Sequence, residues 1–244
     1  MPDEAMRSVL SRWRSLGVHF DVASARGTPD LERLLLDTAS LLPRNARLFH
    51  TTVAWLRRHG DAIARHRLRR LIATEPDHDA LPALALLLDS ADEGEHPARF
   101  AAVIGDLRPA DVPHPLFDVE RATATLVERA RRRASAVSLR WHLWAEPAEP
   151  RPDVLAPSMT VMEKHPRLRL ATDFRGDMRA SVLAALLHDP DSGNGETSLA
   201  AAAGGSRAQV RNALANLELT GRARRVRTPG IRRTRIVVDD CASA

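Results

Sequence analysis

The stretch 198–238 constrains the fold more than any other part of the chain, because strong helix, turn and strand signals follow one another in it. It opens with an alanine-rich helical segment that ends at a Gly-Gly pair. Ser206 comes next and Gln209 follows three residues later, which is the spacing of a capping box at a helix N-terminus. Gly221 is placed to end this second helix in a left-handed conformation. The sequence therefore predicts two helices joined by a very short turn.

The second predicted helix has one apolar side and one polar side. Its apolar side chains recur at helical spacing and predict a buried stripe: Val210, Ala213, Leu214 and Leu217. The opposite side carries small, cationic and amide side chains: Arg207, Ala208, Arg211, Asn212 and Ala215. Such a face lets a nucleic-acid backbone approach closely, and arginine and asparagine are side chains that bind base edges.

A basic β-hairpin is predicted directly after this helix. Two β-capable runs, 222–227 and 231–238, are separated by Thr228-Pro229-Gly230, a strong turn signal. Positions 222 to 235 hold seven arginines and no acidic residue. Cations this dense on a short hairpin repel one another unless a polyanion neutralises them.

A further amphipathic segment, 177–188, precedes these elements and predicts the first helix of a small bundle. The order helix, helix, turn, helix and two-stranded wing resembles the winged helix-turn-helix superfamily of prokaryotic DNA-binding proteins. The resemblance covers 174–240 and is carried by Leu199-Ala200, Gly204-Gly205-Ser206, Val210, Leu214, Leu217 and Gly221. The connection 189–196 departs from the pattern, because it is longer and more acidic than a tight helix connection.

The resemblance implies that the helix 206–216 enters the major groove of duplex DNA, while the wing contacts phosphates or the minor groove. The implied contacts on the helix are Arg207, Gln209, Arg211, Asn212 and Asn216. Those on the wing are Arg222, Arg224, Arg225, Arg227, Arg232, Arg233 and Arg235. Domains of this kind also bind proteins, so a protein-binding role is the alternative.

The preceding part of the chain, 1–146, predicts a helical domain. Proline and glycine separate helical segments at 28–42, 44–59, 61–73, 79–91, 97–107 and 118–145. Helices joined by such short turns pack as antiparallel neighbours, in a bundle or a stack of helical pairs. A proline-rich linker, 147–173, is expected to follow, with a short strand at 167–172 where apolar and polar residues alternate. The whole chain is therefore predicted to be mainly α-helical.

Several conspicuous clusters have ordinary structural interpretations. The arginines within 65–70 and 129–133 are expected on solvated helix faces, with a phosphate contact as the lesser alternative for 129–133. Trp13, Trp55, Trp141 and Trp144 are expected in buried positions, although the last two could stack on a ligand. In 77–79, Asp-His-Asp, neighbouring side chains on a helix point about 100° apart, so helix capping is favoured over a metal site.

Composition narrows the functional classes only modestly. The 244 residues carry 36 basic and 31 acidic side chains, a net charge of +5, and all but one of the basic residues are arginine. This arginine bias is also what a GC-rich genome produces. Cys241 is the single cysteine, which excludes an intramolecular disulfide and a cysteine-based zinc site. The start of the chain shows no secretory signal, so a cytoplasmic protein is expected.

These observations predict a sequence-specific duplex DNA-binding protein, used as a transcriptional regulator, with no catalytic residues, metal or cofactor. A single winged helix covers a short site, so a homodimer on a two-part operator is expected. The domain 1–146 would then provide dimerisation or bind a protein or small-molecule effector. Two alternatives stay open: a winged-helix adaptor of antitoxin-like or chromosome-associated type, and a DNA-processing enzyme with a carboxylate or histidine cluster in 1–146.

Overall fold

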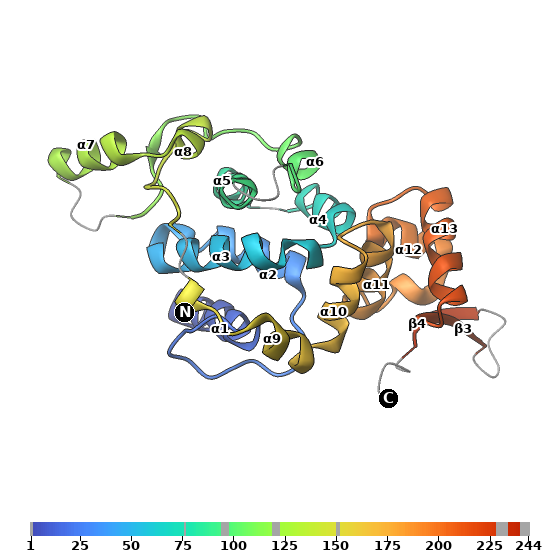
Figure 1. Cartoon of the computed structure of the whole chain (residues 1–244). Helices are drawn as coiled ribbons and strands as arrows, with labels where there is room; N and C mark the ends of the chain where they lie inside the picture. The colour runs from blue at the N-terminus through green and yellow to red at the C-terminus, as the bar shows by residue number, and fades with distance from the viewer. Residues whose placement is uncertain are drawn as a thin grey trace. The chain divides into compact units, whose positions relative to one another are not determined.

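The computed structural model describes residues 2–75, 77–93, 98–118, 123–149, 152–227 and 234–239 (Figure 1). These residues form thirteen α-helices, several short 3-10 turns and two small two-stranded sheets. The prediction of a mainly helical protein is confirmed. Among the described residues, every helix is too short or too polar to span a lipid bilayer.

The chain divides into two compact units, and each is discontinuous in sequence. The N-terminal unit consists of Met1–Gly60 and Glu75–Val161, and the C-terminal unit consists of Asp61–Thr74 and Met162–Ala244. This division differs from the expected boundary at residue 146. Helix α4 (Arg65–Ile72) belongs to the C-terminal unit because it packs on helices α11 (Met178–His188) and α12 (Glu196–Ala203). Most of the expected linker belongs to one unit or the other.

The N-terminal unit is built around α5 (Leu81–Asp92), which Figure 1 shows end-on. Helices α2 (Leu31–Ala39) and α3 (Ala46–His59) pack on it, and α1 (Pro2–Ser15) packs on α2. Residues 83–88 of α5 are all buried, so this helix has no solvent-facing side over that length. A helix that is apolar all round is stable only when it is covered on every side, which explains its central position.

Two tryptophans anchor the same core, as predicted. Trp13 and Trp55 are fully buried, and their rings meet edge to face with centroids 5.3 Å apart. Each indole N–H has an acceptor, which a buried tryptophan requires. The Trp13 indole donates to the Thr38 hydroxyl at 2.9 Å, and the Trp55 indole donates to the Leu16 carbonyl at 3.1 Å.

The long helix expected over 118–145 is not formed. Its place is taken by α7 (Ala124–Arg133), α8 (Ala136–Arg140) and the short strand β2 (Leu143–Trp144), which pairs in parallel with β1 (His114–Pro115). The break comes at Ala134, which is extended, and at Ser135, whose side chain accepts from the Ser138 amide and starts a new helix. Local capping therefore overrides the long helical pattern. Helix α6 (Ala101–Ile104) also belongs to this unit.

The predicted linker is mostly helical. Within 152–173 lie a 3-10 turn (Pro152–Val154), α9 (Ser158–Lys164) and α10 (Pro166–Asp173). The strand expected at 167–172 is therefore wrong. Proline at the first helical position favours a helix start, and Leu168 is buried on one side of the helix so formed. The remaining 3-10 turns are Leu42–Arg44, Gly60–Ala62, His78–Ala80 and Ser192–Asn194.

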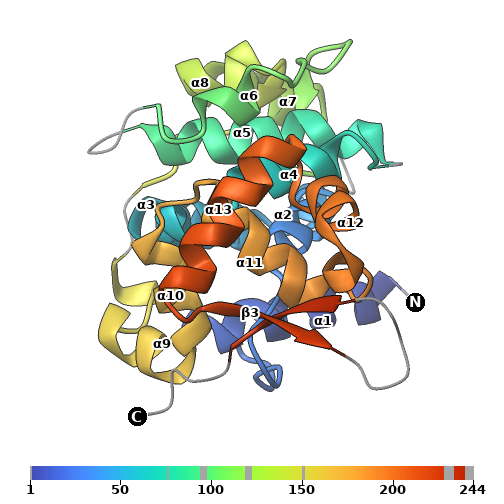
Figure 2. The same cartoon turned by 90° about the vertical axis from the view of Figure 1, so that its right-hand side faces the viewer.

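The C-terminal unit places three helices and a hairpin around one apolar core. Helices α11, α12 and α13 (Arg207–Leu219) are followed by strands β3 (Ala223–Arg227) and β4 (Thr234–Val238), which pair antiparallel. In Figure 2, α13 runs diagonally across α11, and the hairpin follows it. The core contains Val182, Leu183, Leu199, Ala203, Val210, Leu214, Leu217 and Ile236. The predicted order of elements from 177 to 238 is thus observed.

Helix α4 is bound into this unit by Arg65, Arg67 and Arg70, and the burial of Arg67 corrects part of the solvated face expected at 65–70. The Arg67 side chain is 1% exposed, and its Nε and Nη2 donate to the two carboxylate oxygens of Asp189 at 3.1 and 3.2 Å. Arg65 donates to the carbonyl of Arg175 at 2.7 Å, and Arg70 donates to that of Ala201 at 3.0 Å. Arg67 is thus buried against the neighbouring helices and Arg65 is half-buried, whereas Arg69 and Arg70 are exposed.

Candidate functional site

Helix α13 has the capping and the burial that its sequence predicts. The Ser206 hydroxyl accepts from the Gln209 amide at 3.2 Å, and the Gln209 side-chain oxygen accepts from the Ser206 amide at 2.9 Å. The predicted stripe is buried, since Val210, Leu214 and Leu217 have no exposed surface and Ala213 very little. Gly221 has φ +65°, the left-handed conformation expected there. Burial of one side turns the opposite side of α13 to solvent.

The exposed side of α13 holds most of the residues expected to bind DNA. Arg207, Arg211 and Asn212 are exposed on it. Gln209 is exposed too, but its carbonyl oxygen is committed to the helix cap. Asn216 is half-buried, and its side-chain oxygen accepts from Arg179 Nη1 at 3.3 Å. The polar surface free to meet a partner is therefore concentrated in the first half of the helix.

The hairpin presents exposed arginines on both strands. Arg224, Arg225 and Arg227 are exposed on β3, Arg235 is exposed on β4, and Arg222 is half-buried just before β3. Arg232 and Arg233, with the Thr228-Pro229-Gly230 turn, lie outside the described residues, as does Cys241. The structure thus places five of the seven expected wing residues, four of them on the surface.

Carboxylates reach several of these arginines. The two oxygens of Glu196 accept from Arg211 Nε and from Arg225 Nη2, each at 3.1 Å. Arg225 also donates from Nε to Glu218 at 2.7 Å. Hydrogen bonds from Arg225 and Arg211 lower the pKa of Glu196, and the bonds to Glu218 and Glu196 raise that of Arg225. The cationic surface therefore includes the Glu196 carboxylate, whose ionised form these hydrogen bonds stabilise.

The other basic residues of this surface differ in their partners. Arg224 Nε lies 3.6 Å from the Asp239 carboxylate, and Arg235 donates to the Pro190 carbonyl at 2.9 Å. Within the described part of the chain, the side chains of Arg207, Arg222 and Arg227 have no hydrogen bond or ion pair. Three cations of this surface are thus uncompensated there.

The carboxylate partners are the functional residues that sequence reasoning missed. Glu196, Glu218 and Asp239 lie beside arginines that are 7 to 29 positions away in sequence, and no local pattern pairs them. One signal was present: the acidic character of 189–196. In the structure this segment runs along the hairpin, with Gly193 so close to the Ile236 carbonyl that a side chain would collide with it.

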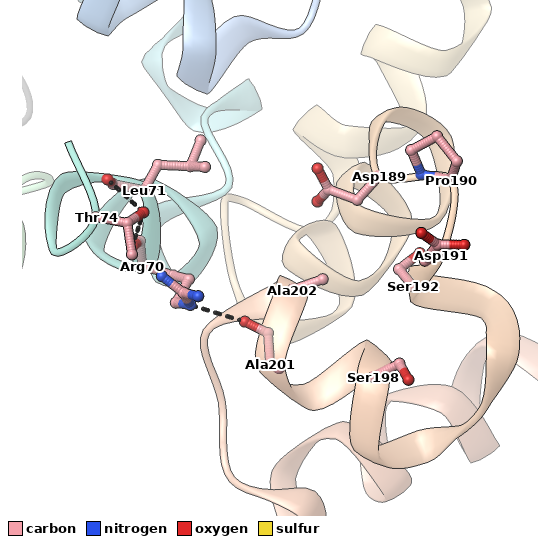
Figure 3. Close-up of a pocket in the computed structure, with 10 residues that line it drawn as sticks. All are labelled: Arg70, Leu71, Thr74, Asp189, Pro190, Asp191, Ser192, Ser198, Ala201 and Ala202. Atoms are coloured by element: carbon pink, nitrogen blue, oxygen red, sulfur yellow. Dashed lines mark hydrogen bonds between the residues drawn. The ribbon is translucent and has the colours of Figure 1, made fainter. Parts of the chain in front are cut away.

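A separate open hollow of about 450 Å³ lies in the C-terminal unit between α4, α12 and the segment 189–192 (Figure 3). Most of its polar side chains are already hydrogen-bonded to other groups of the protein. Asp189 binds Arg67, and the Thr74 hydroxyl donates to the carbonyls of Arg70 and Leu71. Figure 3 shows the bond from Arg70 to Ala201 at its edge. The hollow therefore lacks a convergent set of polar groups for chemistry.

Acidic and histidine residues do not gather into a metal-binding group anywhere in the described ranges. The 77–79 segment forms part of a 3-10 turn, and Asp77 makes no side-chain capping bond, so the expected cap is also absent there. Comparison of the chain with protein-family models, curated proteins and solved structures finds no match.

Proposed function

We propose that the protein binds duplex DNA through its C-terminal unit, folded as a winged helix, and acts as a transcriptional regulator. The observation that carries the proposal is the exposed side of α13, where Arg207, Arg211 and Asn212 adjoin a hairpin with four exposed arginines. A capped helix with its apolar side buried leaves a rigid polar face for base edges. The arginines of the hairpin would bind phosphates, which fix register without reading sequence.

The remaining parts of the proposal follow from this assignment. A single helix reads a short site, so we propose a homodimer whose two recognition helices are one helical turn of DNA apart, about 34 Å. The N-terminal unit would supply the dimer contact or bind an effector. We also place the protein in the cytoplasm and assign it no enzymatic activity.

The test is duplex binding measured by gel retardation at several salt concentrations, on fragments from the gene's own upstream region and on random sequence. We expect binding that weakens steeply with salt, because each neutralised phosphate releases counterions. The variant Arg224→Glu/Arg227→Glu should lose at least about ten-fold in affinity. The matched control is Arg131→Glu/Arg132→Glu, which changes the charge equally on α7. Equal losses in both variants, or no retardation at low salt, would refute the proposal.

One observation favours a protein partner instead. Leu219, at the end of α13, is 87% exposed, and Arg211, Arg224 and Arg225 already lie beside carboxylates of this chain. An exposed leucine at the end of this helix, with charges already compensated within the chain, would suit a protein-binding surface. Under this alternative, Leu219→Ser abolishes capture of a partner protein. DNA binding is then negligible for the wild type and for the Arg224→Glu/Arg227→Glu variant alike.

A further inference from the structure

Glu196 is the point at which three elements of the proposed DNA-binding surface meet. It is the first residue of α12, and its carboxylate is shared by Arg211 of α13 and Arg225 of β3. Each guanidinium group donates a hydrogen bond to a different carboxylate oxygen, at 3.1 Å in both cases. Two arginines from separate elements are therefore aimed at one small anion.

A carboxylate and a phosphate are interchangeable ligands for such a pair of guanidinium groups. Both present oxygens to which arginine N–H groups donate short, charge-assisted bonds. The two arginines also stay accessible, with side chains 62% exposed for Arg211 and 44% for Arg225, while Glu196 is 18% exposed. An incoming phosphate can therefore reach the guanidinium groups from solvent without any movement of the backbone.

Glu196 has little structural need for both partners. Its position at a helix N-terminus already favours a negative side chain. Ion pairs at this exposure add little to stability, so the arrangement does not have to exist in order to hold the fold together. Glu218 also binds Arg225, so two carboxylates of the chain would compete with a phosphate for this arginine.

We infer that Arg211 and Arg225 form one phosphate-binding locus and that Glu196 occupies it in the free protein as a built-in competitor of DNA. The inference rests on the proposed function, which it deepens by naming a regulatory contact at the same surface. DNA must displace the Glu196 carboxylate to gain this locus. The competition lowers sequence-independent affinity, which is supplied almost wholly by phosphate contacts.

The test compares Glu196→Gln with Asp37→Asn by fluorescence anisotropy on a labelled random-sequence duplex. Both substitutions remove one negative charge from a surface ion pair, because Asp37 is bound by Arg12 at 2.8 Å in the N-terminal unit. We expect Glu196→Gln to bind about five-fold more tightly than the wild type, the factor that one well-formed exposed ion pair represents. Asp37→Asn should stay within about two-fold, since Asp37 belongs to the N-terminal unit, which is not proposed to contact DNA.

Glu196→Asp separates bridging from net charge. It keeps the negative charge but is one methylene shorter, so it cannot meet both guanidinium groups, and affinity should rise about two-fold. Adding Arg211→Gln to Glu196→Gln should remove the gain. Equal affinities for wild type and Glu196→Gln would overturn the inference and leave the proposed function standing. Absence of binding by both proteins, when both are folded by circular dichroism, would overturn the proposed function itself.

Discussion

Helices α4 and α7 have nearly the same kind of sequence and opposite surroundings. Residues 65–70 read RHRLRR and residues 128–133 read ERARRR. In α4, Arg67 is buried and Arg65 and Arg70 bind backbone carbonyls of the C-terminal unit. In α7 every arginine is exposed, as predicted. None of its residues is buried, although Leu126, Val127 and Ala130 were expected to face inward.

The difference comes from what the rest of the chain offers each helix. Leu68 and Ile72 give α4 an apolar side, and two glycines, Gly176 and Gly204, let neighbouring backbone approach it. A side chain at either glycine would collide with a carbonyl of Ile63 or His66. Helix α7 contacts the short strands β1 and β2 but buries none of its residues against them. An arginine-rich helix is thus structural or solvated according to its distant neighbours, and its own composition does not decide which.

The largest effect that tests this comparison is expected for Asp189→Asn. It removes the carboxylate charge that faces the buried Arg67 guanidinium. Because the Asp189 side chain is itself 36% exposed, we expect a cost of about 3 kcal/mol of unfolding free energy, the lower end of the range for a buried pair. Circular dichroism during urea unfolding measures it. Tryptophan fluorescence is the internal control, because all four tryptophans lie in the N-terminal unit. A loss below about 1 kcal/mol, the value of an exposed ion pair, would show that the arginines of α4 contribute no more to stability than those of α7.

Gly204→Ala should destabilise the C-terminal unit by about 3 kcal/mol, combining left-handed strain with a collision. Gly204 has φ +75°, and an added methyl would meet the His66 carbonyl and the Arg70 side chain of α4. Gly27→Ala is the matched control, since Gly27 has φ +74° with open space around it. It should cost about 1 kcal/mol, the strain alone. If the two variants cost the same, close packing of α4 contributes nothing.

Acidification should lower the stability of the protein through two histidines on either side of Gly60, the residue at which the first segment of the N-terminal unit ends. Burial, assisted by Arg58, lowers the pKa of His59 to about 4. Burial and then Arg69 and Arg65 lower that of His66, and Asp177 opposes them. Because the unfolded chain takes up a proton near pH 6.5 and the folded chain resists it, stability falls as pH drops from about 6.5 towards 4.

His59 should account for about 2 kcal/mol of that loss between about pH 7.5 and pH 5. The measurement is urea unfolding at both pH values, followed by tryptophan fluorescence, which reports on the unit that contains His59. In His59→Phe the same pH change should leave the fluorescence transition nearly unmoved. An equal shift in wild type and variant would assign the pH dependence to other groups.

The smallest effect belongs to α7. Arg131→Ala/Arg132→Ala should change unfolding free energy by less than about 0.5 kcal/mol, as expected for exposed residues outside any packed contact. Circular dichroism and tryptophan fluorescence should both be unaffected. A loss above about 1 kcal/mol would show that α7 is held by a surface, and the contrast with α4 would disappear.

Sequence reasoning succeeded where the determinants are local. The cap at Ser206, the stripe through Val210 and Leu217 and the stop at Gly221 all depend on residues within one or two turns. It failed where a partner is remote, as for Arg67, whose carboxylate partner is 122 positions away. It also missed two local helix starts, Pro166 within the expected linker and the Ser135 cap within the long helix expected over 118–145.

The same limit applies to the candidate site. Exposure of Arg207, Arg211 and Asn212 followed from helical periodicity, because the buried stripe fixes the opposite face. The charge compensation of Arg211 and Arg225 by Glu196 could not be predicted in this way. The two arginines are 15 and 29 positions from Glu196 and meet it only when α12, α13 and the hairpin are assembled.

The discontinuous C-terminal unit has a consequence for biosynthesis. Helix α4 leaves the ribosome about a hundred residues before α11 and α12, the helices on which it packs. Domains generally fold as they emerge, but this one must wait until α11, α12 and the elements that pack with them have been made. Until then Leu68 and Ile72 lack the helices on which α4 packs, and Arg67 lacks the Asp189 carboxylate, so the nascent chain carries an unfinished helix while the whole intervening sequence is made.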